Sequence, residues 1–139
     1  MQFDSDGTVA TLNFDDGKVN AIGHGIIDDI VAGLSWAQTE ASAVLTVGRD
    51  GLLSGGFDLK VIREGGDAVR VMMKKVADLF YRLLTHPQPL VIACTGHAVA
   101  AGAFLLSSGH GSAHKSWPNC RKKPMPRTNG TVVAGLSQP

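Results

Sequence analysis

Two glycine-rich segments of this chain could present backbone N–H groups to a ligand oxygen. The first covers residues 49–59 and the second covers residues 95–103. Glycine lets a backbone N–H approach a ligand without crowding, and a helix that starts after such a segment adds the positive end of its dipole. One N–H group from each segment would make an oxyanion hole, which stabilises a carbonyl oxygen as it gains negative charge.

Carboxylates are missing from the part of the chain that includes the second segment. Residues 1–78 contain 12 acidic and 7 basic residues, whereas residues 79–139 contain 6 basic residues and no Asp or Glu. A carboxylate is a common proton carrier in active sites, so its absence limits the chemistry that the second segment can support. The basic run Arg121-Lys122-Lys123 has no interleaved aromatic residues. We therefore interpret it as solvated charge and do not expect nucleic-acid binding.

The segments that must position these loops alternate between strand and helix patterns. Apolar alternation predicts a strand at residues 8–14, at the edge of a sheet, and continuous apolar runs predict buried strands at residues 43–47 and 90–94. Helical periodicity predicts one helix from Gly25 to about residue 37 and another from Asp67 to about residue 85. This order is typical of an α/β fold with right-handed crossovers, in which sites form at the carboxyl ends of strands.

Length and composition predict one small globular domain. The chain has 139 residues, of which 44% are hydrophobic. Its apolar runs are too short to span a bilayer, and its first residues lack the pattern of a secretory signal, so we expect a cytoplasmic protein. Cys94 and Cys120 lack the pattern of a disulfide framework and are predicted to be reduced.

Three motifs in order resemble the enoyl-CoA hydratase/isomerase, or crotonase, family. They are residues 18–22, 53–60 and 96–103, and the resemblance extends over about residues 3–106. It implies a crotonase-like ββα spiral core over residues 1–108, which would be incomplete. Residues 109–139 form a basic tail with Pro and Gly that lacks an apolar face, and we expect this tail to be disordered.

The resemblance also implies a site. Members of this family act on acyl-CoA thioesters as lyases or isomerases, in reactions that include those of fatty acid metabolism. They hold the thioester oxygen with two backbone N–H groups, which match Phe57 and Ala101 here. Coenzyme A enters as part of the substrate, and no separate cofactor or metal is implied. The implied substrate-binding positions, with possible phosphate contacts from the two lysines, are Lys18, Asn20, Ala21, Ser54, Gly56, Asp58, Leu59, Lys60 and Gly102. Asp58 also fits the N-cap of a helix that starts at Leu59.

The chain departs from the family pattern at both catalytic glutamates. Phe104 stands three residues after Ala101, where hydratases carry the first, and residues 121–127, where the second would fall, contain no carboxylate. We therefore expect thioester binding with impaired catalysis. The alternative is a non-catalytic truncated or frameshifted fragment that binds a CoA ester, a partner subunit or a polyanion. Family members form trimers, but the elements that build that interface are mostly missing from this sequence.

Histidine, serine and cysteine residues between positions 110 and 120 raise two other site types. His110, His114 and Cys120 could ligate a metal, but their spacing lacks a fourth ligand. Ser112 lies between two histidines without the nucleophile elbow of a hydrolase. Neither a metal site nor a hydrolase is expected.

Overall fold

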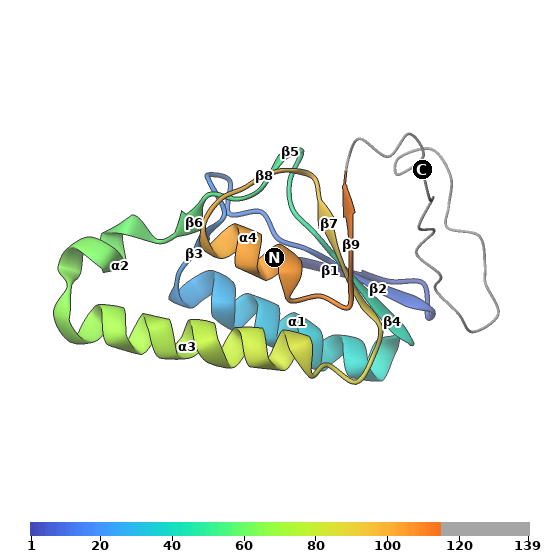
Figure 1. Cartoon of the computed structure of the whole chain (residues 1–139). Coiled ribbons are helices and arrows are strands. Elements are labelled where there is room, and N and C mark those ends of the chain that lie inside the picture. Colours follow the sequence, from blue (N-terminus) through green and yellow to red (C-terminus); the bar gives the residue numbers. More distant parts are fainter. Residues whose placement is uncertain (115–139) are drawn as a thin grey trace, which may run out of the picture.

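The main sheet is built mostly from parallel strands that follow one another in chain order. The computed structural model describes residues 1–114. The sheet order is β1-β2-β4-β7-β9, as Figure 1 shows. Its strands are β1 (Gln2–Ser5), β2 (Val9–Asn13), β4 (Ala43–Val47), β7 (Leu90–Cys94) and β9 (Gly111–His114). Only the β1–β2 pair is antiparallel, which confirms the predicted α/β class.

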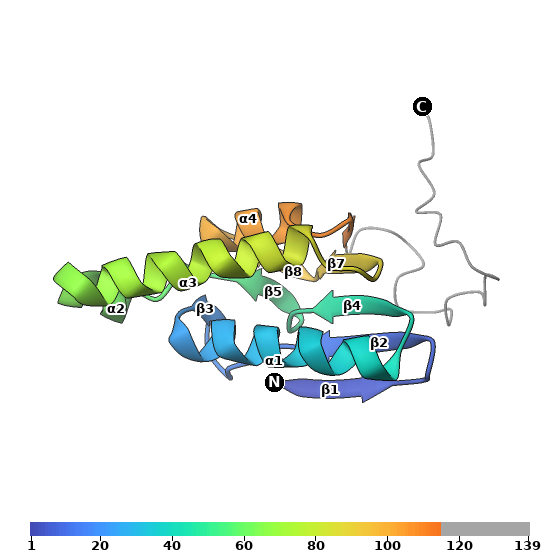
Figure 2. The same cartoon turned by 90° about the horizontal axis from the view of Figure 1, so that it is seen from below.

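Two long helices pack side by side on one side of the molecule because each carries an apolar stripe. Helix α1 (His24–Glu40) buries Ile27, Ile30 and Leu34, and it packs against β1, β2 and β4. Helix α3 (Gly66–Leu84) buries Met72, Val76, Leu79 and Leu83 and lies beside α1, as Figure 2 shows from below. Fully burying one such aliphatic side chain contributes roughly 1.5–3 kcal/mol.

Two short parallel sheets join the loops that follow the main strands. Strand β3 (Ala21–Ile22) pairs with β6 (Gly56–Phe57), and β5 (Gly51–Ser54) pairs with β8 (Gly96–Ala98). Helix α2 (Leu59–Glu64) follows β6, and α4 (Ala101–Ser107) follows β8. Helix α4 contacts both short sheets and also β7 and β9, so it ties the loop region to the main sheet.

The structure corrects the predicted position of the first strand. Strand β2 lies inside the sheet, and the edge is formed by β1, which the sequence analysis did not predict. Strand β1 is held by contacts that its own pattern does not reveal. The Phe3 ring stacks on Trp36 of α1 at 5.5 Å between centroids. A Cβ on Gly33 of the same helix would lie 2.8 Å from Phe3, so this glycine makes room for the ring.

The structure also corrects the predicted start of the tail. Gly111–His114 form β9, which pairs in parallel with β7 from Val91↔Gly111 to Cys94↔His114. Backbone pairing with an edge strand gives this segment order without an apolar face. The His110 ring adds a tie, since its Nδ1 accepts a 3.2 Å hydrogen bond from Leu90 N–H. The rest of the predicted tail lies outside the described residues, as does Cys120.

No helix within residues 1–114 is long and apolar enough to cross a membrane.

Candidate functional site

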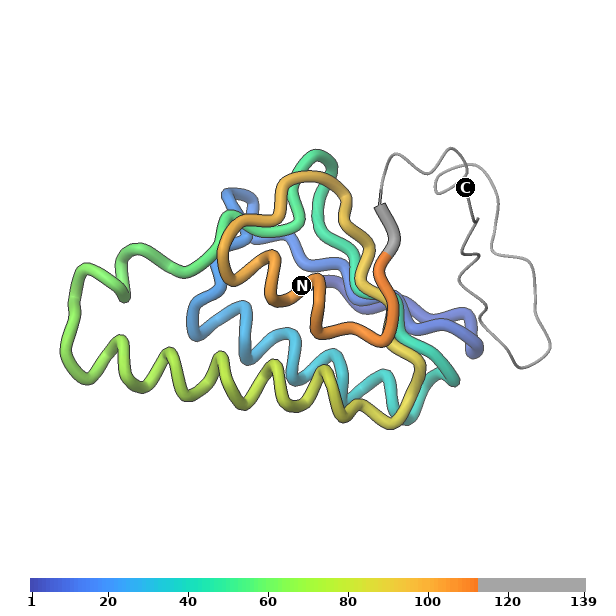
Figure 3. Tube along the Cα trace, viewed as in Figure 1, coloured from blue at the N-terminus to red at the C-terminus, as the bar shows by residue number. Residues whose placement is uncertain are grey.

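The two glycine-rich segments lie against each other beyond the carboxyl ends of β4 and β7. Figure 3 shows them meeting at the top of the molecule, one green and one orange. Gly51 N–H donates to the Thr95 carbonyl at 3.0 Å. A Cβ on Gly96 would lie only 2.0 Å from the Gly51 carbonyl carbon, so the two backbones approach too closely for any other residue.

A second close approach brings β6 to the start of α4. Gly56 has φ +100°, and a Cβ there would lie 3.0 Å from the Val99 carbonyl oxygen. A Cβ on Gly102 would lie 2.8 Å from the Ser54 Cβ. Val99 N–H donates to the Ser54 carbonyl at 3.0 Å. The sequence order places these residues about 45 positions apart, but the fold packs them backbone to backbone.

In the first turn of helix α4, one backbone N–H group has no acceptor within the turn. The first four N–H groups of a helix have no partner four residues earlier within it. Gly102 N–H donates to the Val99 carbonyl at 2.8 Å, while Ala103 and Phe104 donate to the Ala100 carbonyl at 2.9 and 3.2 Å. The N-cap residue, Ala100, has no side chain that could cap the helix. The N–H of Ala101 is therefore the one that this turn cannot satisfy.

The backbone at Ala100 is unusual and was not predicted. This residue has φ 46° and ψ −112°, a region that L-residues rarely adopt and that costs about 1–3 kcal/mol. It turns the peptide that carries the Ala101 N–H. An alanine in the sequence gives no signal for positive φ, so only the structure reveals this feature.

Strand β6 directs the other candidate N–H away from its partner strand. Asp58 N–H donates to the Ile22 carbonyl of β3 at 3.1 Å. Successive N–H groups of a strand point to opposite sides, so the Phe57 N–H faces away from β3. Phe57 is half-buried, whereas Ala101 is fully buried. A ligand oxygen reaches the Ala101 N–H only if the residues that cover it move aside.

Asn20 and Ser54 are fully buried and bond to the backbone of several segments. Asn20 Nδ2 donates to the carbonyls of Phe14 at 3.0 Å and Leu53 at 3.2 Å, and its Oδ1 accepts from Asp16 N–H at 3.0 Å. Ser54 Oγ donates to the Asn20 carbonyl at 2.7 Å and accepts from Gly56 N–H at 3.1 Å. Both side chains were expected at the substrate, but in this structure they hold the loops together.

Asp16 belongs to the same network. Its partial burial raises the pKa of the carboxyl, but hydrogen bonds from the backbone N–H groups of Asn20 and Lys18 outweigh burial and lower the pKa below its usual value. The charged carboxylate therefore stabilises the turn that leads to Asn20. The Asp-Asp-Gly turn is visible in the sequence, but its connection to Asn20 is not.

The other expected binding residues differ in how far a ligand can reach them. The side chains of Lys18, Leu59 and Lys60 are exposed, and Ala21 and Asp58 are half-buried. Asp58 Oδ1 accepts from Lys60 N–H at 2.9 Å, which confirms the predicted N-cap of α2. The two lysines are therefore accessible to an anion, while Asp58 already has a structural role.

The position that follows Ala101 by three residues carries an exposed aromatic ring. Phe104 is 60% exposed on the outer face of α4 and packs against Phe80 of α3, with 6.3 Å between ring centroids. This ring cannot transfer a proton. Among residues 1–114, no three His, Cys, Asp or Glu side chains gather in a way that could hold a metal ion.

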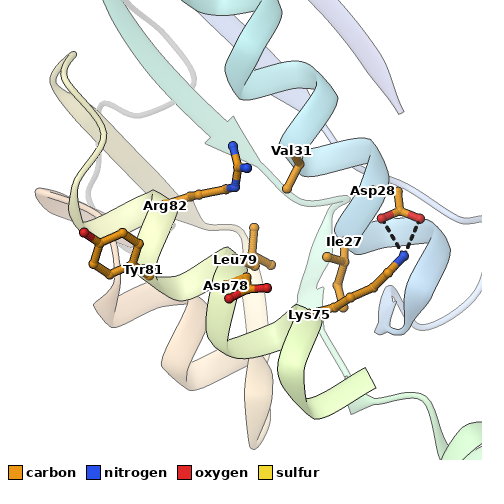
Figure 4. A pocket seen from close by; sticks show the side chains of 8 residues that line it. All are labelled: Ile27, Asp28, Val31, Lys75, Asp78, Leu79, Tyr81 and Arg82. Atoms are coloured by element: carbon orange, nitrogen blue, oxygen red, sulfur yellow. Dashed lines mark hydrogen bonds and ion pairs between the residues drawn. The ribbon is translucent and has the colours of Figure 1, made fainter. Parts of the chain in front are cut away.

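A groove lies between α1 and α3, on the side of the molecule opposite the glycine-rich segments in Figure 1. Its volume is about 630 Å³. Figure 4 shows that Lys75 reaches across it to Asp28, and Nζ lies 2.8 Å from Oδ1. The other lining residues are Ile27, Val31, Asp78, Leu79, Tyr81 and Arg82. Its mixed charges and its distance from the loops separate it from the candidate oxyanion hole.

The chain resembles known proteins in sequence and in fold. A family model described as enoyl-CoA hydratase/isomerase matches residues 4–108. A search of curated proteins found no match. Among solved structures, the chain is similar to an enoyl-CoA hydratase/isomerase family protein from Pseudomonas syringae, with 41% identity, TM-score 0.78 and coverage of 81% of this chain and 49% of that one.

Two further solved structures resemble the chain to a similar extent. An enoyl-CoA hydratase from Mycobacterium ulcerans Agy99 has 39% identity and TM-score 0.76, with coverage of 80% of this chain and 50% of that one. An enoyl-CoA isomerase from Mycobacterium tuberculosis has 38% identity and TM-score 0.75, with coverage of 80% and 49%. The chain thus spans about half the length of these proteins, and the matched half contains both glycine-rich segments.

Proposed function

Because this chain belongs to the enoyl-CoA hydratase/isomerase family, we propose that it binds acyl-CoA thioesters and holds the thioester oxygen with the backbone N–H groups of Phe57 and Ala101. Its fold is the crotonase fold of its solved relatives. The two N–H groups polarise the carbonyl and stabilise the enolate that forms when a neighbouring C–H proton is lost.

One observation carries this proposal. The backbone of β6 meets the start of α4 closely enough that a Cβ on Gly56 would lie 3.0 Å from the Val99 carbonyl oxygen and 3.4 Å from the Ala100 Cβ. The two donors are the N–H groups of Phe57, which follows Gly56, and of Ala101, which follows Ala100. They therefore lie on either side of this close contact. One donor faces away from its partner strand and the other cannot be satisfied within its helix, which leaves both for a ligand.

The access that we propose lies beside residues 99 and 100, which are exposed and directly precede Ala101. Val99 is 53% exposed, so its side chain can move without disturbing the core. The half-buried Ala21, Phe57 and Asp58 and the exposed Leu59 border the route that we propose for the acyl-CoA. Lys18 and Lys60 supply the positive charge that its phosphates need.

Proton transfer is the step that this chain supports least. The proposed oxyanion hole retains polarising power, but the ring of Phe104 occupies the place of a family glutamate. General acid or base catalysis contributes a factor of about 10²–10⁴. We therefore propose that the chain binds and polarises enoyl thioesters and hydrates them slowly or not at all.

A binding experiment with two ligands tests the proposed oxyanion hole. A conjugated enoyl-CoA thioester absorbs at longer wavelength when its carbonyl oxygen accepts hydrogen bonds, and the matching thioether lacks that oxygen. Each net hydrogen bond contributes about 0.5–1.5 kcal/mol, so we expect the thioester to bind about tenfold more tightly and to shift to the red on binding. Equal affinity for the two ligands would contradict the proposal.

An amide-to-ester replacement removes one proposed donor. Lactic acid in place of Ala101 lacks the N–H but keeps the methyl group and adds no ring that would disturb the turn at Ala100, so it should remove most of the red shift. The same replacement at Ala68, in the first turn of α3 and away from the glycine-rich segments, should leave the shift intact. Rapid hydration of crotonyl-CoA by the unmodified chain would contradict the proposal that its catalysis is impaired.

A further inference from the structure

We propose that Ser54 is a positioning residue that fixes the direction of the Phe57 N–H relative to the Ala101 N–H. This inference rests on the proposed oxyanion hole and deepens it. Ser54 does not bond to the thioester, because its hydroxyl already donates to the Asn20 carbonyl and accepts from Gly56 N–H. It acts through the backbone of β6.

Ser54 is bonded to each of the three segments that build the candidate site. Its Oγ donates to the Asn20 carbonyl at 2.7 Å and accepts from Gly56 N–H at 3.1 Å. Its carbonyl accepts from Val99 N–H at 3.0 Å, two residues before Ala101. The hydroxyl thus makes its hydrogen bonds on the Phe57 side of the site, and the main-chain carbonyl makes its hydrogen bond on the Ala101 side, where the Ser54 side chain also packs against Gly102.

Asn20 makes the acceptor of the Ser54 hydroxyl rigid. Asn20 has φ 51°, a left-handed conformation, and its own N–H donates to Asp16 Oδ1 at 2.9 Å. Its side chain bridges the ends of β2 and β5 through the Phe14 and Leu53 carbonyls. These bonds fix the Asn20 carbonyl. The Ser54 hydroxyl, which donates to this carbonyl, therefore has one favourable orientation.

Removing the Ser54 hydroxyl should affect the two donor N–H groups differently. In Ser54→Ala the carbonyl of residue 54 remains, so the Val99 hydrogen bond and the direction of the Ala101 N–H are kept. The Gly56 N–H loses its acceptor one residue before Phe57, at a glycine with φ +100° whose backbone dihedrals have a wider allowed range than those of other residues. We therefore expect the Phe57 N–H to turn while the Ala101 N–H stays in place.

The test uses the full chain and the conjugated enoyl-CoA thioester. Ser54→Ala should keep its affinity within about fivefold, because one proposed donor and the CoA contacts remain, while losing at least half of the red shift. Ser108→Ala is the matched control. Ser108 is also buried, at 5% exposure, and its Oγ donates to the Phe104 carbonyl at 2.7 Å. This control removes a buried hydroxyl from the same region and should leave the shift unchanged.

A second variant keeps the test decisive if Ser54→Ala is unstable. Ser54→Cys retains the size of the side chain with a weaker donor and acceptor, and it should give an intermediate shift. In amide NMR spectra without ligand, the Phe57 signal should move in both Ser54 variants more than the Ala101 signal.

The possible results separate the two proposals. A full red shift in both Ser54 variants overturns the role of Ser54 and leaves the oxyanion hole standing. A wild-type chain that binds the thioester no better than the thioether overturns the oxyanion hole and the role of Ser54 with it. Equal losses in Ser54→Ala and Ser108→Ala would show that any buried hydroxyl matters and would also overturn the inference.

Discussion

The loop region and the helical layer of this molecule are stabilised in different ways. In the loop region, backbones touch at Gly51 and Gly96, and buried polar side chains such as Asn20 bond to main-chain atoms. In the layer of α1 and α3, apolar side chains fill the interface, and the surface carries an open groove with the Lys75–Asp28 ion pair.

The difference determines which changes each region tolerates. Backbone contacts leave no room for an added carbon atom, because main-chain atoms cannot rotate aside as a side chain does. Helix surfaces face solvent and accept substitutions that preserve the buried stripe. The region proposed to hold the ligand is therefore the one that admits the fewest side chains.

The largest expected effect comes from adding one methyl group to the loop region. In Gly96→Ala the new Cβ would overlap the Gly51 backbone, so β5 and β8 must separate, and we expect the free energy of unfolding to fall by about 3 kcal/mol. Urea denaturation followed by circular dichroism measures this change. The matched variant in the helical layer is Gly25→Ala, where no atom lies within 4 Å of the added Cβ.

Gly25→Ala should stabilise the protein by about 0.5 kcal/mol, since alanine favours the helix and finds open space. Equal destabilisation by the two substitutions would remove the contrast between the regions.

A smaller effect is expected from pH at the end of the helical layer. Burial is the largest cause that lowers the pKa of His86 below its usual value, and the nearby His110 ring acts in the same direction. The unfolded chain therefore binds a proton at higher pH than the folded chain does. As the pH falls below about 6.5, the unfolded state gains protons first and stability decreases.

Thermal melts from pH 7.5 to 5.5 measure this dependence. The Tm of His86→Gln should fall less over that range than the Tm of the wild-type chain, because glutamine does not titrate. Parallel curves for the two proteins would exclude His86 as the cause.

The smallest effect is expected at the ion pair in the groove. The Lys75 and Asp28 side chains are 38% and 63% exposed, so solvent and salt screen their attraction. Lys75→Ala should cost less than about 1 kcal/mol, and the cost should shrink in 0.5 M salt. Lys74→Ala, at the neighbouring exposed residue, is the control, and an equal effect would show that the ion pair contributes nothing specific.

The main strands and helices could be predicted because each has a continuous local signal. The apolar runs at residues 43–47 and 90–94 coincide with β4 and β7, and the helical stripes correspond to α1 and α3. Strands β5, β6 and β8 were not predicted. Their small residues show no apolar alternation, and their pairing depends on partners far away in the chain.

The candidate site could be predicted only in part for the same reason. Glycine-rich turns and family motifs pointed to the two segments, and the structure brings them together. The buried roles of Asn20 and Ser54 follow from bonds between residues 33 and 34 positions apart, which no local pattern encodes. The positive φ of Ala100 has no sequence signal because alanine seldom adopts it.

The strand order of the main sheet bears on how the protein is made. The order β1-β2-β4-β7-β9 is also the order in which the strands leave the ribosome. Each parallel strand can therefore add to an edge that already exists, and none has to insert between two earlier strands. Domains often begin to fold during synthesis, where unpaired strand edges invite aggregation. A nascent chain of this topology exposes one growing edge at a time, and that edge moves from β2 to β9 as translation proceeds.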